Sequence, residues 1–185
     1  MFLGPLGARE DMRVSIDYFR QFAAYNHWAN RRLYAAALAM PDEPYRRPTG
    51  VFFGSLHGTL NHLLLTDRIW LKRLTDEGDP PNQHNAILHE DRNALARARM
   101  AEDARLIDVV GRYTQDELRG LVAYHNMSGA PFRQELGQIL LHLFNHQTHH
   151  RGQAHACCSI VTGEEPPSLD LLQFQRGVPA PDLAV

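Results

Sequence analysis

The chain has 185 residues, of which 44% are hydrophobic and 22% charged, and its formal net charge is −2. This composition is ordinary for a globular protein with an apolar core, and we expect residues 1–185 to form a single domain. With a net charge this close to zero, the sequence gives no sign of the basic surface expected of a protein that binds nucleic acid or anionic lipid. No apolar run is as long as a membrane span. We therefore expect neither nucleic acid nor membrane among the partners.

Residues 1–12 carry glycine, proline and acidic residues but no basic stretch followed by an apolar core. We interpret them as a loose N-terminal extension, not a signal peptide. Cys157 and Cys158 are adjacent in a helical pattern, which disfavours a disulfide between them, and we expect Cys157 to be a buried small hydrophobic residue. These features indicate a reducing, cytoplasmic setting.

Four segments have the apolar spacing of long helices, with hydrophobic residues every three or four positions. Ser15 is a suitable N-cap for the first, and Pro41 ends it. Gly163 follows the last in the position where glycine commonly ends a helix. The four predicted helices are residues 15–40, 55–75, 91–113 and 133–162.

The connections between these helices differ in character. Residues 41–50 contain three prolines and are predicted to be irregular, and residues 78–90 form a polar loop long enough to serve as a lid or binding loop. The side chains of residues 121–132 alternate in character along the chain, which predicts a short hairpin or an extended crossover. Residues 164–185 are predicted to be an extended C-terminal strap that packs Leu169, Leu172 and Phe174. The predicted fold class is all-α, a four-helix bundle.

The fourth predicted helix carries His142, His146 and His150 at intervals of four residues. At about 100° per residue, neighbours in this series lie only about 40° apart around the helix axis, so their imidazoles follow one stripe. A pair such as His146 and His150 can bind one metal ion, because neutral imidazole is a good ligand for Zn, Ni, Fe or Cu. The alternative is a row of histidines that make core hydrogen bonds or face solvent.

A third histidine on another helix favours the metal interpretation. His62 lies on the apolar face of the second predicted helix, and with His146 and His150 it would form a three-nitrogen site with an open position. Such a site could activate water or bind a thiol as thiolate. A carboxylate-bridged di-iron centre is not indicated, because no glutamate has a histidine three residues later. The zincin motif also fails, because Asn93 stands where its second histidine should be.

The remaining histidines of the first three segments are expected to lie outside the site. His27 is more consistent with a surface residue than with a ligand, and His57 points about 140° away from His62, so we expect it to be exposed. His84 and His89 are expected to be solvated, although either could approach a substrate from the long loop.

Three stretches together resemble a known family: residues 28–31 (WANR), 55–70 (SLHGTLNHLLLTDRIW) and 144–153 (FNHQTHHRGQ). They are similar to the DinB family of bacterial metal-binding proteins, whose name refers to induction by DNA damage. The resemblance covers nearly the whole chain. It implies a four-helix bundle with up-down-down-up connection, a homodimer, and a divalent metal held by His62, His146 and His150. His142 and His149 would then be neighbours of the ligands.

Relatives in this superfamily include isomerases and S-transferases that use low-molecular-weight thiols such as mycothiol or bacillithiol. The resemblance therefore implies a metal-dependent S-transferase whose partners are a small-molecule thiol and an electrophile. Two other functions stay open: a non-catalytic metal-binding protein linked to stress, and a metal-dependent hydrolase, since the same site could activate water.

Overall fold

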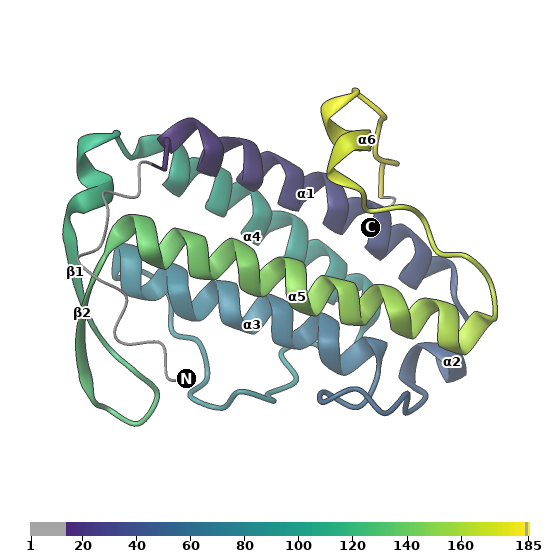
Figure 1. Ribbon diagram of the computed structural model, residues 1–185. Coiled ribbons are helices and arrows are strands. Elements are labelled where there is room, and N and C mark those ends of the chain that lie inside the picture. Colours follow the sequence, from purple (N-terminus) through teal and green to yellow (C-terminus); the bar gives the residue numbers. More distant parts are fainter. Residues whose placement is uncertain (1–13, 184) are drawn as a thin grey trace, which may run out of the picture.

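The computed structural model describes residues 14–183 and 185, and the predicted loose extension at residues 1–12 lies outside them. Four long helices lie lengthwise beside one another: α1 (Ile16–Ala39), α3 (Leu56–Thr75), α4 (Arg92–Arg112) and α5 (Leu136–Thr162) (Figure 1). Helices α1 and α3 each pack against both α4 and α5. Within the described residues, no helix combines the length and the apolar character needed to cross a membrane.

The helix ends follow the signals in the sequence. The side chains of Ser15, Ser55 and Asp91 accept hydrogen bonds from backbone N–H groups in the first turns of α1, α3 and α4. Gly163 ends α5 with φ 72°, a left-handed conformation that glycine adopts without steric penalty. Three helices therefore begin within a residue of the predicted positions.

Helix α5 begins later than predicted, at Leu136, because residues 131–135 belong to a hairpin. Strand β1 (Leu121–His125) pairs antiparallel with β2 (Pro131–Glu135), with Leu121 opposite Glu135 and His125 opposite Pro131. The backbone N–H of Leu136 donates to Gly120 O at 2.9 Å, which ties the start of α5 to the base of the hairpin. The hairpin prediction is confirmed, and the start of α5 at residue 133 is wrong.

Short helices interrupt two segments that were predicted to be irregular. Helix α2 (Asp42–Arg46) lies in the proline-containing connection, and α6 (Leu171–Gln175) lies in the C-terminal strap. A 3-10 helix, η1 (Asp116–Arg119), links α4 to β1. The strap is therefore not extended throughout, and Leu172 is 51% exposed instead of packed.

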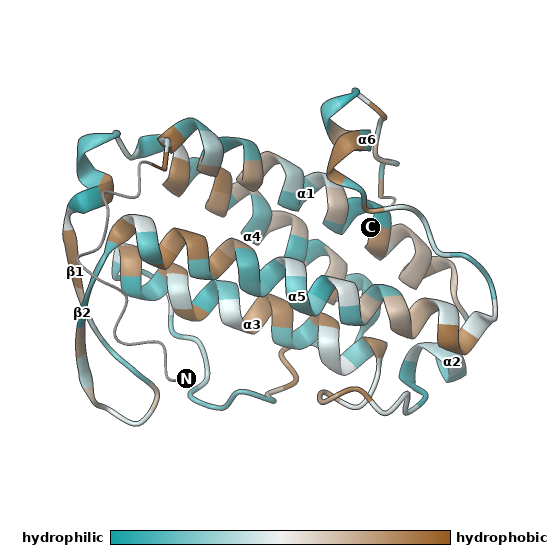
Figure 2. Cartoon of the chain, in the orientation of Figure 1, coloured by the Kyte–Doolittle hydropathy of each residue, from teal (hydrophilic) through white to brown (hydrophobic). Residues whose placement is uncertain are grey.

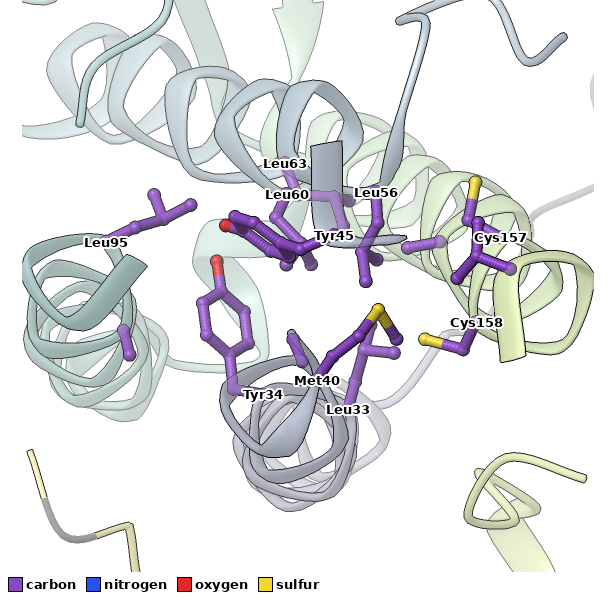
Figure 3. Close-up of a cluster of buried hydrophobic side chains, with 14 of the residues drawn as sticks. Leu33, Tyr34, Met40, Tyr45, Leu56, Leu60, Leu63, Leu95, Cys157 and Cys158 are labelled. Atoms are coloured by element: carbon purple, nitrogen blue, oxygen red, sulfur yellow. The ribbon is translucent and has the colours of Figure 1, made fainter. Parts of the chain in front are cut away.

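The two larger clusters of the apolar core lie at opposite ends of the bundle. Brown and teal residues alternate along each long helix in Figure 2, as expected for helices with one buried face. The part nearer α2 is shown in Figure 3 and includes Leu33, Tyr34, Tyr45, Leu56 and Leu60. Cys157 and Cys158 belong to this cluster as free, buried thiols, which confirms the prediction for Cys157. The other part lies toward the hairpin and includes the residues Phe19, Leu71, Leu106, Leu140 and Phe144.

A buried polar layer separates these two apolar parts, because each long helix carries polar residues midway between its two core segments. At its centre, the guanidinium of Arg99 lies 2.8 Å from an oxygen of Asp67 and 2.9 Å from an oxygen of Asp103, and all three side chains are fully buried. The amides of Asn26 and Asn30 donate to Asp103 at 3.0 Å each. Helices α1, α3 and α4 are therefore joined by charge-assisted contacts in the interior.

Helix α5 enters the same layer through two residues beside its histidines. The amide of Gln147 donates to Leu63 O at 3.1 Å and to the carboxylate of Asp67. Arg151 is buried, and its guanidinium donates to Asn26 Oδ1. Gln147 directly follows His146, and Arg151 directly follows His150. The polar layer therefore also fixes the rotation of this part of α5 about its axis.

The C-terminal segment packs on α1 within the same chain. Tyr25 Oη donates to Leu169 O at 2.7 Å, and Trp28 Nε1 donates to Val178 O at 2.7 Å. The ring of Phe174 contacts both rings at steep interplanar angles of 65° and 58°, with centroid distances of 5.9 Å. Trp28 is consequently only 6% exposed. The Trp28 side chain is therefore covered by the chain's own C-terminal segment and exposes little surface to a partner.

Candidate metal centre

Three histidines from two helices lie together on one side of the polar layer. His62 projects from α3, and His146 and His150 project from successive turns of α5. One ring nitrogen of each lies within 4.8 Å of the others, and the Nε2 atoms of His62 and His146 are 3.2 Å apart. The helical spacing of the sequence therefore does bring these three imidazoles to one point.

Hydrogen bonds orient two of the rings. His62 Nδ1 lies 3.0 Å from His84 O, and His150 Nδ1 lies 2.8 Å from Gln153 Oε1. Both partners are carbonyl oxygens, which can only accept, so each Nδ1 carries the proton. The Nε2 atoms of His62 and His150 are therefore unprotonated, the form in which imidazole binds a metal, and that of His62 lies 3.2 Å from His146 Nε2 and 3.5 Å from Thr66 Oγ1.

The loop between α3 and α4 supplies the carbonyl that orients His62. Its end is held by Asn61, whose Oδ1 accepts from the backbone N–H groups of Leu88 and His89 at 2.9 and 3.0 Å. His57 Nε2 donates to His89 O at 3.0 Å, and His57 is only 5% exposed. The expectation that His57 is exposed is wrong, because the loop folds over the face of α3 that carries it.

Burial keeps the cluster neutral. Desolvation, reinforced by the neighbouring histidines, lowers the pKa of His62 to about 4 and that of His146 to about 3. Desolvation also lowers the pKa of His150. His146 Nδ1 is buried without a hydrogen-bond partner. Neutral imidazoles whose nitrogens converge within 4.8 Å of one another fit a divalent cation such as Zn, Ni or Fe.

These pKa values predict how the stability of the metal-free protein depends on pH. An unfolded histidine titrates near pH 6.5, so between about pH 6.5 and 4 the unfolded chain binds protons that folded His62 and His146 do not. The contribution of these two histidines to the free energy of unfolding should be highest above about pH 6.5 and should fall as the pH is lowered toward 4. Urea titrations of metal-free protein across this range measure the slope. A His146→Asn variant should lose less stability over this pH range than the wild type. A slope equal to that of the wild type would contradict the assignment.

An aromatic side chain forms one wall of the centre. Phe53, in the loop before α3, stacks on His62 with ring centroids 3.6 Å apart and an interplanar angle of 17°, and its ring lies edge-on to His150 at 5.3 Å. The same loop appears as a hydrophobic stretch in Figure 2. The sequence did not identify Phe53 as part of the site, because nothing in its spacing relates it to the histidines.

Gly58 permits this placement of Phe53. A Cβ atom at residue 58 would lie 2.0 Å from the carbonyl oxygen of Phe53, a backbone atom that cannot turn aside. Gly58→Ala should therefore displace the loop and the stacked ring, with a loss of about 1–3 kcal/mol in the free energy of unfolding. Chemical denaturation measures this loss. Gly152→Ala is the matched control, because a Cβ there meets no atom within 4 Å, and an equal effect at both positions would contradict the explanation.

A pocket of about 530 Å³ opens beside His62 and His146, toward the hairpin. His142 lies at this pocket, with its ring 5.2 Å from that of Trp70 and 5.9 Å from that of His146. His149 is exposed and accepts from Gln153 Nε2 at 3.2 Å. His142 therefore lines the space in front of the cluster, and His149 contacts the residue that orients His150. Sequence reasoning missed the pocket residues of the hairpin, namely Tyr124, Asn126, Met127, Ser128 and Phe132.

The side chains of His27, His84 and His89 are not among the three clustered imidazoles. His27 is partly exposed and lies 3.7 Å from Asp103, as expected for a residue at the surface. His84 contributes only its backbone carbonyl to the orientation of His62, although the residue also lines the pocket. His89 likewise takes part through its backbone.

The fold and this cluster define a class: helical proteins in which three histidines from two packed helices could hold one metal ion. Comparison with known proteins gives the family. The model of the DinB family matches residues 12–181, and the chain belongs to that family. The protein DinB of Bacillus subtilis is 24% identical over 148 residues, which span 74% of this chain and 81% of that protein.

A solved structure agrees on the fold. The crystal structure of a DinB-like protein from Bacillus cereus superposes with a TM-score of 0.62 at 16% sequence identity, covering 93% of this chain and 99% of that one. At this identity the likeness concerns the arrangement of helices alone.

Proposed function

We propose that the protein binds a divalent metal through His62, His146 and His150 and transfers a low-molecular-weight thiol to an electrophile. The observation that carries this proposal is the set of three neutral imidazoles, with nitrogens within 4.8 Å, that adjoins an open pocket. Three protein ligands leave a coordination position for an exogenous group, whereas a structural site is closed by four. In keeping with the family, we also propose that the long helices follow an up-down-down-up connection.

The chain's own residues position the reactants. His84 O and Gln153 Oε1 hold the rings of His62 and His150 so that their Nε2 atoms face the site. Phe53 and Trp70 form apolar walls, which limit access of bulk water. A bound metal would lower the pKa of a thiol and so make a thiolate available near neutral pH.

The proposed reaction balances without a redox partner. The thiol releases its proton to solvent, its sulfur lone pair forms a bond to the electrophilic carbon, and the leaving group departs with the bonding electrons. Because a bound metal would lower the pKa of the thiol, this step requires no general base on the protein.

The test is a screen of thiols against electrophiles with protein purified without a nickel column and then loaded with Zn, Ni or Fe. We expect transfer that depends on both metal and thiol and that a chelator removes. Stoichiometric metal binding without transfer to any electrophile would instead support a non-catalytic metal-binding protein. Turnover of an ester or amide that proceeds without thiol would support metal-dependent hydrolysis.

A further inference from the structure

Arg73 is an unusual residue in the pocket, because among the described residues its guanidinium stacks on aromatic rings and pairs with no carboxylate. It lies near the end of α3, with its guanidinium 4.5 Å from the ring centroid of Trp70 and 5.0 Å from that of Tyr124. In residues 14–183, no carboxylate forms an ion pair with it. Stacking on two rings holds the planar group in place and leaves its N–H donors free for another partner.

The surroundings of Arg73 make it an uncompensated positive charge. Burial lowers its pKa, and its charge in turn contributes to a lowered pKa at His142. The described pocket lining contains no aspartate or glutamate, and Arg73 is its only lysine or arginine. A bound metal at the histidine cluster would add further positive charge. The pocket is therefore complementary to an anion.

We propose that Arg73 binds the carboxylate of an elongated small molecule whose reactive end lies at the histidine cluster. This assignment rests on the proposed function for the reactive end only, since the guanidinium and its two rings are present whether or not a metal binds. Arginine suits a carboxylate because its parallel N–H groups match both oxygens. A single cation between aromatic walls complements one negative charge better than a doubly charged phosphate.

The separation of the two ends sets the length of the ligand. His62 and Arg73 are eleven residues apart on α3, about 16 Å along its axis. Side chains on a helix lean toward its N-terminus, which brings the long Arg73 side chain toward the cluster and shortens this span. Trp70 and His142 lie between the two ends. Asn82 Nδ2 donates to Met127 O at 3.1 Å, so the long loop and the hairpin meet near the pocket.

The carboxylate could belong to the thiol or to the electrophile, so the test uses a pair of probes for each. Phenylacetate and phenylacetamide represent the electrophile side, and 3-mercaptopropionate and 3-mercaptopropanamide represent the thiol side. Binding is measured by calorimetry and by intrinsic tryptophan fluorescence in wild type, Arg73→Gln and Arg73→Lys. Arg112→Gln is the charge-matched control, because Arg112 pairs with Asp108 on the surface.

In metal-free wild type, at least one carboxylate should bind about tenfold more tightly than its amide, the usual range for a charge-assisted hydrogen bond. Arg73→Gln should abolish this preference, Arg73→Lys should keep part of it, and Arg112→Gln should leave it intact. The pair that shows the preference identifies which reactant carries the carboxylate. The proposal is overturned if neither pair shows a preference, including no binding at millimolar concentration, or if Arg73→Gln retains it.

Zinc content separates the two proposals. Arg73→Gln should bind zinc as wild type does, because Arg73 is not among the three clustered histidines. A protein that binds no zinc but prefers carboxylates through Arg73 would refute the proposed function and support this inference. A protein that binds zinc stoichiometrically without any carboxylate preference would refute this inference and leave the proposed metal site standing.

Discussion

Replacing His146 with alanine should weaken metal binding by more than roughly 100-fold, which exceeds the usual effect of changing an outer-shell partner. The rings of His62, His146 and His150 form a triangle with centroid distances of 5.1, 4.4 and 4.6 Å, so the loss of His146 leaves only two of the three imidazoles that could hold the ion. Any metal-dependent thiol transfer should disappear with the metal. The helices should persist, because their packing rests on apolar clusters that do not include His146.

The matched control is His149→Ala, three residues farther along the same helix. His149 is exposed, and its ring contacts the amide of Gln153 and not the shared nitrogens of the cluster. This variant should keep stoichiometric metal and change the rate of transfer at most slightly. Metal content by mass spectrometry, circular dichroism and transfer rate should be measured for both variants. Transfer that survives in metal-free His146→Ala would remove the metal from the mechanism.

Replacing Arg99 with alanine should lower the free energy of unfolding by about 3–5 kcal/mol, the range for breaking a buried ion pair from one side. Arg99 pairs with both Asp67 and Asp103 inside the bundle, and its removal leaves two buried carboxylates facing each other without the cation. For a chain of this size the expected fall in Tm is on the order of 10 °C. Urea denaturation of metal-free protein gives the free energy directly.

Arg112→Ala provides the comparison for this prediction. Arg112 and Asp108 form an ion pair on the exposed side of α4, and such pairs contribute at most about 1 kcal/mol. Both substitutions remove one arginine from the same helix, so the difference between their effects on the free energy of unfolding reports the contribution of the buried position. An Arg99→Ala variant as stable as Arg112→Ala would show that the polar layer contributes little to the fold.

The sequence determined the long helices and the position of the histidines on them. Apolar spacing and caps such as Ser55 and Asp91 are local signals, and each helix start that rests on them lies within one residue of its predicted place. The alignment of His146 with His150 follows from the helical repeat alone. His62 could be assigned to the same site only because it lies on an apolar face and because the motif resembles the DinB family.

The tertiary structure alone decided what surrounds those histidines. Phe53 and Arg73 reach the site because a loop folds back on α3 and a hairpin packs beside Trp70, and no periodicity in the sequence encodes either contact. His57 was misjudged for the same reason: its helical direction was right, but it is covered by the loop that contains His89, which lies 32 positions farther along the chain. Helical periodicity reports only which face of a helix a residue occupies. What lies against that face depends on contacts between segments distant in the chain, and those contacts form only when the whole chain packs.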